Sequence, residues 1–197
     1  MDDKKALRRS LKAARRAFVN SIPSSQRGLI MRRPPAPLAE RVPEGAIVGV
    51  YYEHADETPA THYARWFHER GHRIALPWLA DRTAPMQFRQ WDNPFAYDEG
   101  LESDPFADGT RRSLQPAADA DCVIPDVLFC PLVGFSANGG RLGMGGGHYD
   151  RWLAAHRPSL AVGLAWDCQL VDDLPSEAHD AVLDAVVTPT RIYWKDI

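Results

Sequence analysis

The sequence has few cysteines and no pair of them at a spacing typical of a zinc site or a redox motif. Cys122, Cys130 and Cys168 are odd in number, and no C-x-x-C motif occurs. Neither a disulfide framework nor a zinc site is therefore predicted. Cys130 lies in an apolar run, which favours a core residue over a nucleophile. This cysteine usage fits a reducing compartment, and we expect a cytoplasmic protein.

Long apolar runs and an excess of positive charge are also missing. No run approaches the ~20 apolar residues that span a bilayer, and the basic N-terminal segment lacks the apolar stretch of a secretory signal. A net charge of −3 argues against general nucleic-acid binding. We therefore expect no membrane and no nucleic-acid partner. A chain of 197 residues can bury one sizeable core, so a single domain over residues 1–197, acting as a monomer, is expected.

The first segment, residues 3–19, has the periodicity of an amphipathic helix. Leu7, Leu11, Ala14 and Phe18 fall on one apolar stripe. A second stripe is basic and contains Lys4, Arg8, Lys12 and Arg15. A solvated charged face is the simplest interpretation of that second stripe. Between residues 20 and 44, Pro34, Pro35 and Pro37 allow a short helix at most.

The remaining elements alternate between strands and helices. Strands are predicted over residues 46–52, 74–77, 86–91, 127–131, 159–165 and 181–187, the third of them at an edge. A helix is expected from Thr58 or Pro59 to about Arg70, ended by Gly71. A strand, a helix and a strand of these lengths form a βαβ unit. We therefore predict a three-layer α/β fold, a mostly parallel Rossmann-like sheet with helices on both faces, which binds ligands at the carboxyl ends of its strands.

The most informative segment is a glycine-rich stretch. Residues 139–151 read GGRLGMGGGHYDR, and an apolar helix-like run follows. Backbone N–H groups of such a loop, with a helix behind it, can converge on an anion. Arg141 offers a planar fork for phosphate, and Asp150 is an oxygen ligand of the kind Mg²⁺ prefers. The stretch is neither a Walker A motif nor a strict G-x-G-x-x-G, and glycines alone indicate only a turn.

The ordered residues around these glycines resemble the signature of the 5-formyltetrahydrofolate cyclo-ligase family, roughly G-x-R-L-G-x-G-[KG]-G-[YF]-Y-D-R. The matching positions are Gly139, Arg141, Leu142, Gly143, Gly145, Gly147, Tyr149, Asp150 and Arg151. The resemblance extends over nearly the whole chain and is weakest over residues 20–44 and 92–121. It implies ATP- and Mg²⁺-dependent cyclisation of 5-formyltetrahydrofolate to 5,10-methenyltetrahydrofolate, with release of ADP and phosphate.

The resemblance also implies a nucleotide site. Family members begin with K-x-x-L-R on a first helix that reaches the phosphates, which Lys4, Leu7 and Arg8 match; Lys5 and Arg9 are the alternative register. Arg141 would be the catalytic cation. The expected ATP-binding set is Lys4, Arg8, Arg141, Leu142, Gly143, Met144, Gly145, Gly146, Gly147, His148 and Tyr149.

Substrate and metal positions follow from the same resemblance. Family members carry a pterin-binding Glu after the first strand. Glu57 matches it, although Glu53 and Asp56 stay open, and an acidic residue there is often only a helix cap. The expected folate contacts are Tyr52, Glu57, Met144 and His148, and the expected Mg²⁺ ligands are Asp150 and Asp180. His179 is interpreted as a loop or capping residue, because Mg²⁺ prefers oxygen.

Three positions depart from the family pattern. Ser136 replaces an Asp, Gly146 replaces the Lys of many members, and His148 replaces the first Tyr of G-Y-Y-D. Two other functions therefore stay open. One is a diverged member that acts on another folate or on a thiamin-related compound. The other is a non-catalytic module that binds a nucleotide or phosphate.

Overall fold

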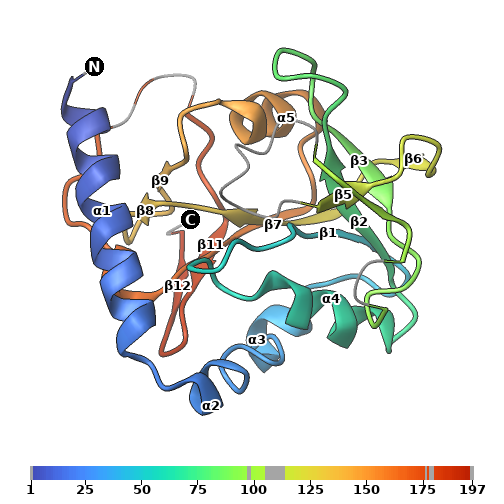
Figure 1. Ribbon diagram of the computed structural model, residues 1–197, viewed down its shortest axis with the longest axis horizontal. Coiled ribbons are helices and arrows are strands. Elements are labelled where there is room, and N and C mark those ends of the chain that lie inside the picture. Colours follow the sequence, from blue (N-terminus) through green and yellow to red (C-terminus); the bar gives the residue numbers. More distant parts are fainter. Residues whose placement is uncertain (1, 97–98, 105–113, 176, 178–179, 196–197) are drawn as a thin grey trace.

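The protein is built on one large twisted sheet with helices on both faces (Figure 1). The computed structural model describes residues 2–96, 99–104, 114–175, 177 and 180–195. The role expected for His179 falls outside the described residues. Among those residues, no helix is both long and apolar enough to cross a membrane.

The eight strands of the main sheet follow the order β12-β11-β10-β7-β1-β2-β3-β6. The five central strands β11, β10, β7, β1 and β2 are parallel, and antiparallel strands complete both sides. Their bounds are β1 Ile47–Gly49, β2 Arg73–Trp78, β3 Gln87–Gln90, β6 Cys122–Val123, β7 Val127–Pro131, β10 Leu160–Leu164, β11 Ala185–Val187 and β12 Ile192–Trp194. Two small hairpins pair β4 Leu101–Ser103 with β5 Leu114–Pro116, and β8 Gly134–Phe135 with β9 Arg141–Leu142.

Helices cover both faces of this sheet, as the predicted three-layer fold requires. α4 (Ala60–His68) packs Tyr63 and Phe67 on one face, where both rings contact Phe129 of β7. α5 (His148–His156) packs Trp152 against Phe88 on the other face. The prediction of a mostly parallel α/β fold is confirmed. The other helices are α1 Asp2–Ser21, α2 Ser24–Arg27, α3 Ala36–Ala39 and the 3-10 turn η1 Asp167–Gln169.

Several expected elements differ from the structure at their ends or in their place. The strand predicted over residues 86–91 is β3, and it is not at the edge, because β6 pairs with it. The strand predicted over residues 181–187 begins only at Ala185, because the amides of Ala181 and Leu183 donate to the Asp150 side chain of α5 and to the Gly139 carbonyl. β12 was not predicted. Cys130 is a core residue as expected, and burial raises the pKa of its thiol to about 12.

α1 lies beside the β8–β9 hairpin (Figure 1). Its Leu11 packs with Val133 and Leu142, and Leu7 packs against the same cluster. An added Cβ on Gly134 would lie 2.5 Å from Leu11 Cδ1, so a glycine at this position lets the helix approach the hairpin closely. The contact orients the basic edge of α1 toward the loops that follow β1 and β9.

Candidate active site

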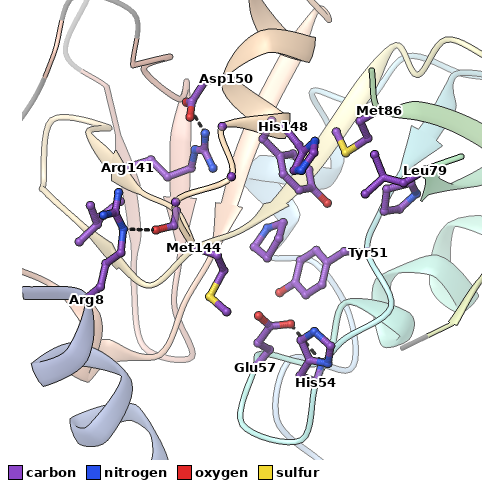
Figure 2. Close-up of a pocket in the computed structure, with 18 of the residues that line it drawn as sticks. Arg8, Tyr51, His54, Glu57, Leu79, Met86, Arg141, Met144, His148 and Asp150 are labelled. Carbon is purple, nitrogen blue, oxygen red and sulfur yellow. Dashed lines mark hydrogen bonds and ion pairs between the residues drawn. The ribbon is translucent and has the colours of Figure 1, made fainter. Parts of the chain in front are cut away.

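A cavity of about 520 Å³ lies at the carboxyl ends of β1 and β7. β1 has β2 on one side and β7 on the other, so the order of the strands reverses there. Such a switch point leaves a crevice between loops that diverge to opposite faces, where open α/β sheets bind ligands. The loops after β1 and β9, the start of α5 and the basic edge of α1 all contribute to its lining. Figure 2 shows Arg8, Arg141 and Met144 on one side and Leu79 and Met86 on the other.

The glycine-rich loop occupies residues 143–147, between β9 and α5. Gly145 and Gly147 have φ values of +109° and +66°, which side chains other than glycine adopt at a cost. Gly147 is the residue before α5, so the loop leads directly into the positive end of a helix. The predicted anion-binding geometry, a glycine loop ahead of a helix, is therefore present in the backbone.

Arg141 is not inside that loop, as the sequence suggested, but in strand β9. The strand pairs with β8, and the Arg141 side chain is 2% exposed. Its Nη2 donates a short hydrogen bond to Asp150 Oδ1 on α5 (Figure 2). Among the described residues, its Nε has no hydrogen-bond partner although it is buried. A cation and a carboxylate that were predicted to hold different ligands therefore pair with each other.

The basic edge of α1 reaches the same cavity. Lys4 Nζ donates to Asp180 Oδ2 at 2.7 Å and lies 3.1 Å from Glu177 Oε1. Burial lowers the pKa of Lys4, but the hydrogen bonds to these carboxylates outweigh it and raise the pKa overall. Arg8 Nε donates to the Gly143 carbonyl at 2.9 Å. Both line the cavity, whereas Lys5 and Arg9 are exposed, so the first of the two predicted registers faces the site.

The three acidic residues after β1 have different surroundings. Glu53 accepts hydrogen bonds from the amide and hydroxyl of Thr61 in the first turn of α4, and burial raises its pKa. Asp56 pairs with Arg15 of α1. Glu57 lines the cavity and accepts a hydrogen bond from the His54 amide at 3.0 Å. Of the three, Glu57 is therefore the one placed to meet a ligand, and Glu53 performs the capping role.

Apolar and aromatic side chains complete the wall. Tyr52, Met144 and His148, the expected folate contacts, line the cavity. Burial, together with Arg151, lowers the pKa of His148. Tyr51 was missed: its hydroxyl lies within hydrogen-bonding distance of Thr58, and burial raises its pKa well above the usual value. Leu79, Met86 and Gln115 also line the cavity and were missed, since their positions after β2, before β3 and within β5 carry no motif.

The carboxylates predicted to bind Mg²⁺ lie close together. Asp150 Oδ1 accepts a hydrogen bond from the amide of Ala181, the residue after Asp180. Within the described part of the chain, no group of three or more His, Cys, Asp or Glu side chains is arranged to hold a metal ion. Mg²⁺ commonly binds one or two carboxylates together with water and phosphate oxygens. The pair fits that kind of site and not a metal cage made of protein alone.

Comparison with known proteins gives consistent results. A family model described as the 5-formyltetrahydrofolate cyclo-ligase family matches residues 1–189. The 5-formyltetrahydrofolate cyclo-ligase of Escherichia coli (strain K12) is 49% identical over 85 residues, which are 40% of this chain and 47% of that protein. The Mycolicibacterium smegmatis enzyme of the same name is 37% identical over 127 residues, 62% of this chain and 63% of that protein. The matched segments thus span about half to two thirds of these relatives.

Solved structures share the fold over a longer stretch. The NMR structure of Aquifex aeolicus 5,10-methenyltetrahydrofolate synthetase superimposes with a TM-score of 0.69 at 24% identity, covering 97% of this chain and 92% of that chain. The synthetase from Mycoplasma pneumoniae gives a TM-score of 0.65 at 18% identity and covers 95% and 99%. With a family model that matches nearly the whole sequence, the chain belongs to the 5-formyltetrahydrofolate cyclo-ligase family.

Proposed function

We propose that this protein uses ATP and Mg²⁺ to cyclise 5-formyltetrahydrofolate to 5,10-methenyltetrahydrofolate, with release of ADP and phosphate. One observation supports this proposal above the others. A single cavity brings together the glycine loop, the cations of α1 and the carboxylate of Glu57. Groups suited to binding phosphate and a hydrogen-bond acceptor suited to a heterocycle therefore line the same cavity. A volume of about 520 Å³ is in the usual range for small-molecule sites.

The reaction needs ATP because the oxygen of a formamide is a poor leaving group. Transfer of the γ-phosphoryl group to the formyl oxygen breaks the bond between the γ-phosphorus and the oxygen that stays with ADP. The formyl group becomes an iminium phosphate, in which the carbon is electrophilic. The N10 lone pair then attacks that carbon, N10 loses its proton, and the C–O bond breaks as phosphate leaves. The five-membered ring closes with a C=N bond. In phosphoryl transfer of this kind, the protein mainly positions reactants and neutralises charge.

At the nucleotide end, ion pairs would exchange partners when ATP binds. Lys4, Arg8 and Arg141 would contact phosphate oxygens, and backbone N–H groups of residues 143–147 would hold them. The cations now paired with Asp180 and Asp150 would then face phosphate. Those two carboxylates would be left to hold Mg²⁺, which supplies further charge neutralisation at the phosphates. The buried Nε of Arg141, without a partner among the described residues, is a further donor for this role.

At the folate end, Glu57 would accept hydrogen bonds from the donor edge of the pterin. Its side chain is 7% exposed, so a bond made there competes little with water. Tyr52, Met144 and His148 would contact the ring system and the reacting formyl group. No covalent bond to the protein is needed, because the formyl oxygen itself receives the phosphoryl group.

The direct test is turnover. Purified protein is mixed with 5-formyltetrahydrofolate, ATP and MgCl₂, and formation of the methenyl product is followed by its absorbance, with ATP omitted in a parallel sample. Product formation that requires ATP is the expected result. ATP binding without turnover of any folate would instead indicate the non-catalytic module, and ATP hydrolysis that depends on a different folate or a thiamin-related compound would indicate the diverged enzyme. Glu57→Gln should raise the KM for the folate and leave that for ATP nearly unchanged.

A further inference from the structure

Arg15 is a fully buried arginine on α1, seven residues after Arg8. Its side chain is 1% exposed, whereas the neighbouring Arg16 is exposed. Moving a guanidinium group out of water is unfavourable, and an apolar side chain of similar size in such a place is often neutral or stabilising. Packing alone therefore does not account for an arginine at this position.

The guanidinium group of Arg15 joins two loops that border the cavity. Its Nε and Nη2 donate to Asp56 Oδ2 at 3.3 and 3.2 Å. Its Nη1 donates to the carbonyl of Leu132, after β7, at 3.3 Å and lies 3.7 Å from Glu57 Oε1. One planar group thus contacts the carboxylates of Asp56 and Glu57 after β1 and the backbone of the loop after β7. A lysine has a single nitrogen and could not make all these contacts at once.

The loop that carries Glu57 lies between two cavities. Tyr52, His54 and Glu57 line the 520 Å³ cavity on one side and a second cavity of about 290 Å³ on the other. A segment bordered by two cavities makes few of the close contacts that make protein interiors rigid. Besides Arg15, the Trp166 indole holds this loop, because its Nε1 donates to the Asp56 carbonyl at 3.1 Å.

We propose that Arg15 is a positioning residue: it fixes the Glu57 carboxylate for the folate substrate and ties the Glu57 loop to the helix that carries Lys4 and Arg8. The three basic residues lie on one edge of α1, and each contacts a different loop around the cavity. The helix therefore sets the distance between the phosphate-binding end and the folate-binding end. This inference rests on the proposed function of Glu57.

The test is a double-mutant cycle with four proteins: wild type, Arg15→Met, Glu57→Gln and the double variant. Arg16→Met is the matched control on the same helix. Arg15→Met should raise the folate KM about tenfold, a typical coupling between contacting residues, and change the ATP KM less than twofold. In the Glu57→Gln background the same substitution should have almost no further effect, because the carboxylate that Arg15 positions is gone. An equal effect in both backgrounds would mean a purely structural role and overturn the proposal.

A second readout does not depend on activity. Hydrogen–deuterium exchange of the segment from Tyr52 to Thr58 should speed up in Arg15→Met and stay at the wild-type rate in Arg16→Met, because the His54 amide bonds to the Glu57 carboxylate. If exchange of this segment is unchanged in Arg15→Met, the inference is overturned, whatever substrate the protein acts on. If exchange is faster but the wild-type protein does not turn over the folate, only the proposed function is rejected. Should Arg15→Met not fold, Arg15→Lys keeps the charge and should move both readouts in the same direction by less.

Discussion

The ammonium group of Lys4 lies 2.7 Å from a carboxylate oxygen of Asp180, which is 176 residues later in the sequence. The nearby Arg141–Asp150 pair repeats the pattern, again joining a predicted phosphate ligand to a predicted Mg²⁺ ligand. The proposed phosphate ligands and the proposed Mg²⁺ ligands thus neutralise one another in pairs. If ATP and Mg²⁺ bind as proposed, phosphate takes the place of each carboxylate and the metal takes the place of each cation, so metal and nucleotide are expected to bind together more tightly than either alone.

The basic edge of α1 gives the first prediction. Lys4→Ala with Arg8→Ala should weaken ATP binding by roughly tenfold to a hundredfold, the effect of losing charge-assisted hydrogen bonds worth ~1.5–3 kcal/mol. Folate binding and thermal stability should change little. Titration of ATP by calorimetry measures the effect. Lys5→Ala with Arg9→Ala is the matched control, since both residues are exposed on the same helix. If both double variants bind ATP as tightly as the wild type does, Lys4 and Arg8 do not bind its phosphates.

The fork of Arg141 gives the second prediction. Arg141→Lys keeps the charge but loses the planar group, and kcat should fall about a hundredfold, equivalent to ~3 kcal/mol of transition-state stabilisation. The conservative change avoids leaving the half-buried Asp150 beside an uncharged residue. Arg157→Lys, at an exposed position just after α5, serves as the control. If kcat is comparable in the two variants and the wild type, Arg141 does not stabilise the transition state.

The metal assignment is tested by the concentration of Mg²⁺ that activity requires. Asp150→Asn and Asp180→Asn should each shift the half-maximal concentration upward, because each removes a negative charge from the ligand set. Asp172→Asn is the control, an exposed carboxylate in the loop before Asp180. If a chelator leaves activity untouched, or if all three variants respond as wild type does, the two carboxylates hold no metal.

His148 gives a prediction for pH. Its lowered pKa leaves the ring neutral at pH 7, and the ring packs beside the glycine loop, where a Cβ on Gly146 would lie 2.9 Å from it. As the pH falls below the ordinary value of 6.5, the ring gains a positive charge next to the proposed phosphate site. ATP affinity should therefore increase in that range, and by linkage ATP should raise the pKa of His148. An NMR titration of the imidazole with and without ATP measures both.

His148 also makes the stability of the folded protein depend on pH, and stability should fall as the pH falls, whereas ATP affinity should rise. The unfolded chain takes up a proton at about pH 6.5, before the folded protein does. The stabilising contribution of neutral His148 is thus full above pH 6.5 and declines as the pH falls toward the lowered folded pKa. His148→Tyr lacks this titrating group, so its urea midpoint should fall less between pH 7.5 and 5.5 than that of the wild type. Parallel curves for the two proteins would contradict the pKa shift.

Strong local patterns explain what could be predicted from the sequence. β7 matches its predicted bounds because its apolar run is bounded by prolines, and the glycine loop matches because two of its residues need positive φ. Tertiary contacts explain the features that the sequence patterns did not predict. Arg15 belongs to a stripe whose pattern predicts a solvated face. It is nevertheless buried, because the carboxylate of Asp56, 41 residues away, forms an ion pair with it. Similarly, β6 and β12 have two and three residues, and only their strand partners define them.

The position of α1 also affects how the protein must be made. Several of the described contacts of this helix come late in the sequence: the β8–β9 hairpin, Glu177 and Asp180, and Trp166, whose ring is 5.8 Å from that of Phe18. A ribosome that adds ~10 residues per second would therefore finish the helix about ten seconds before its docking surface exists. During that interval the amphipathic, basic segment lacks the late contacts that hold it against the hairpin in the folded protein.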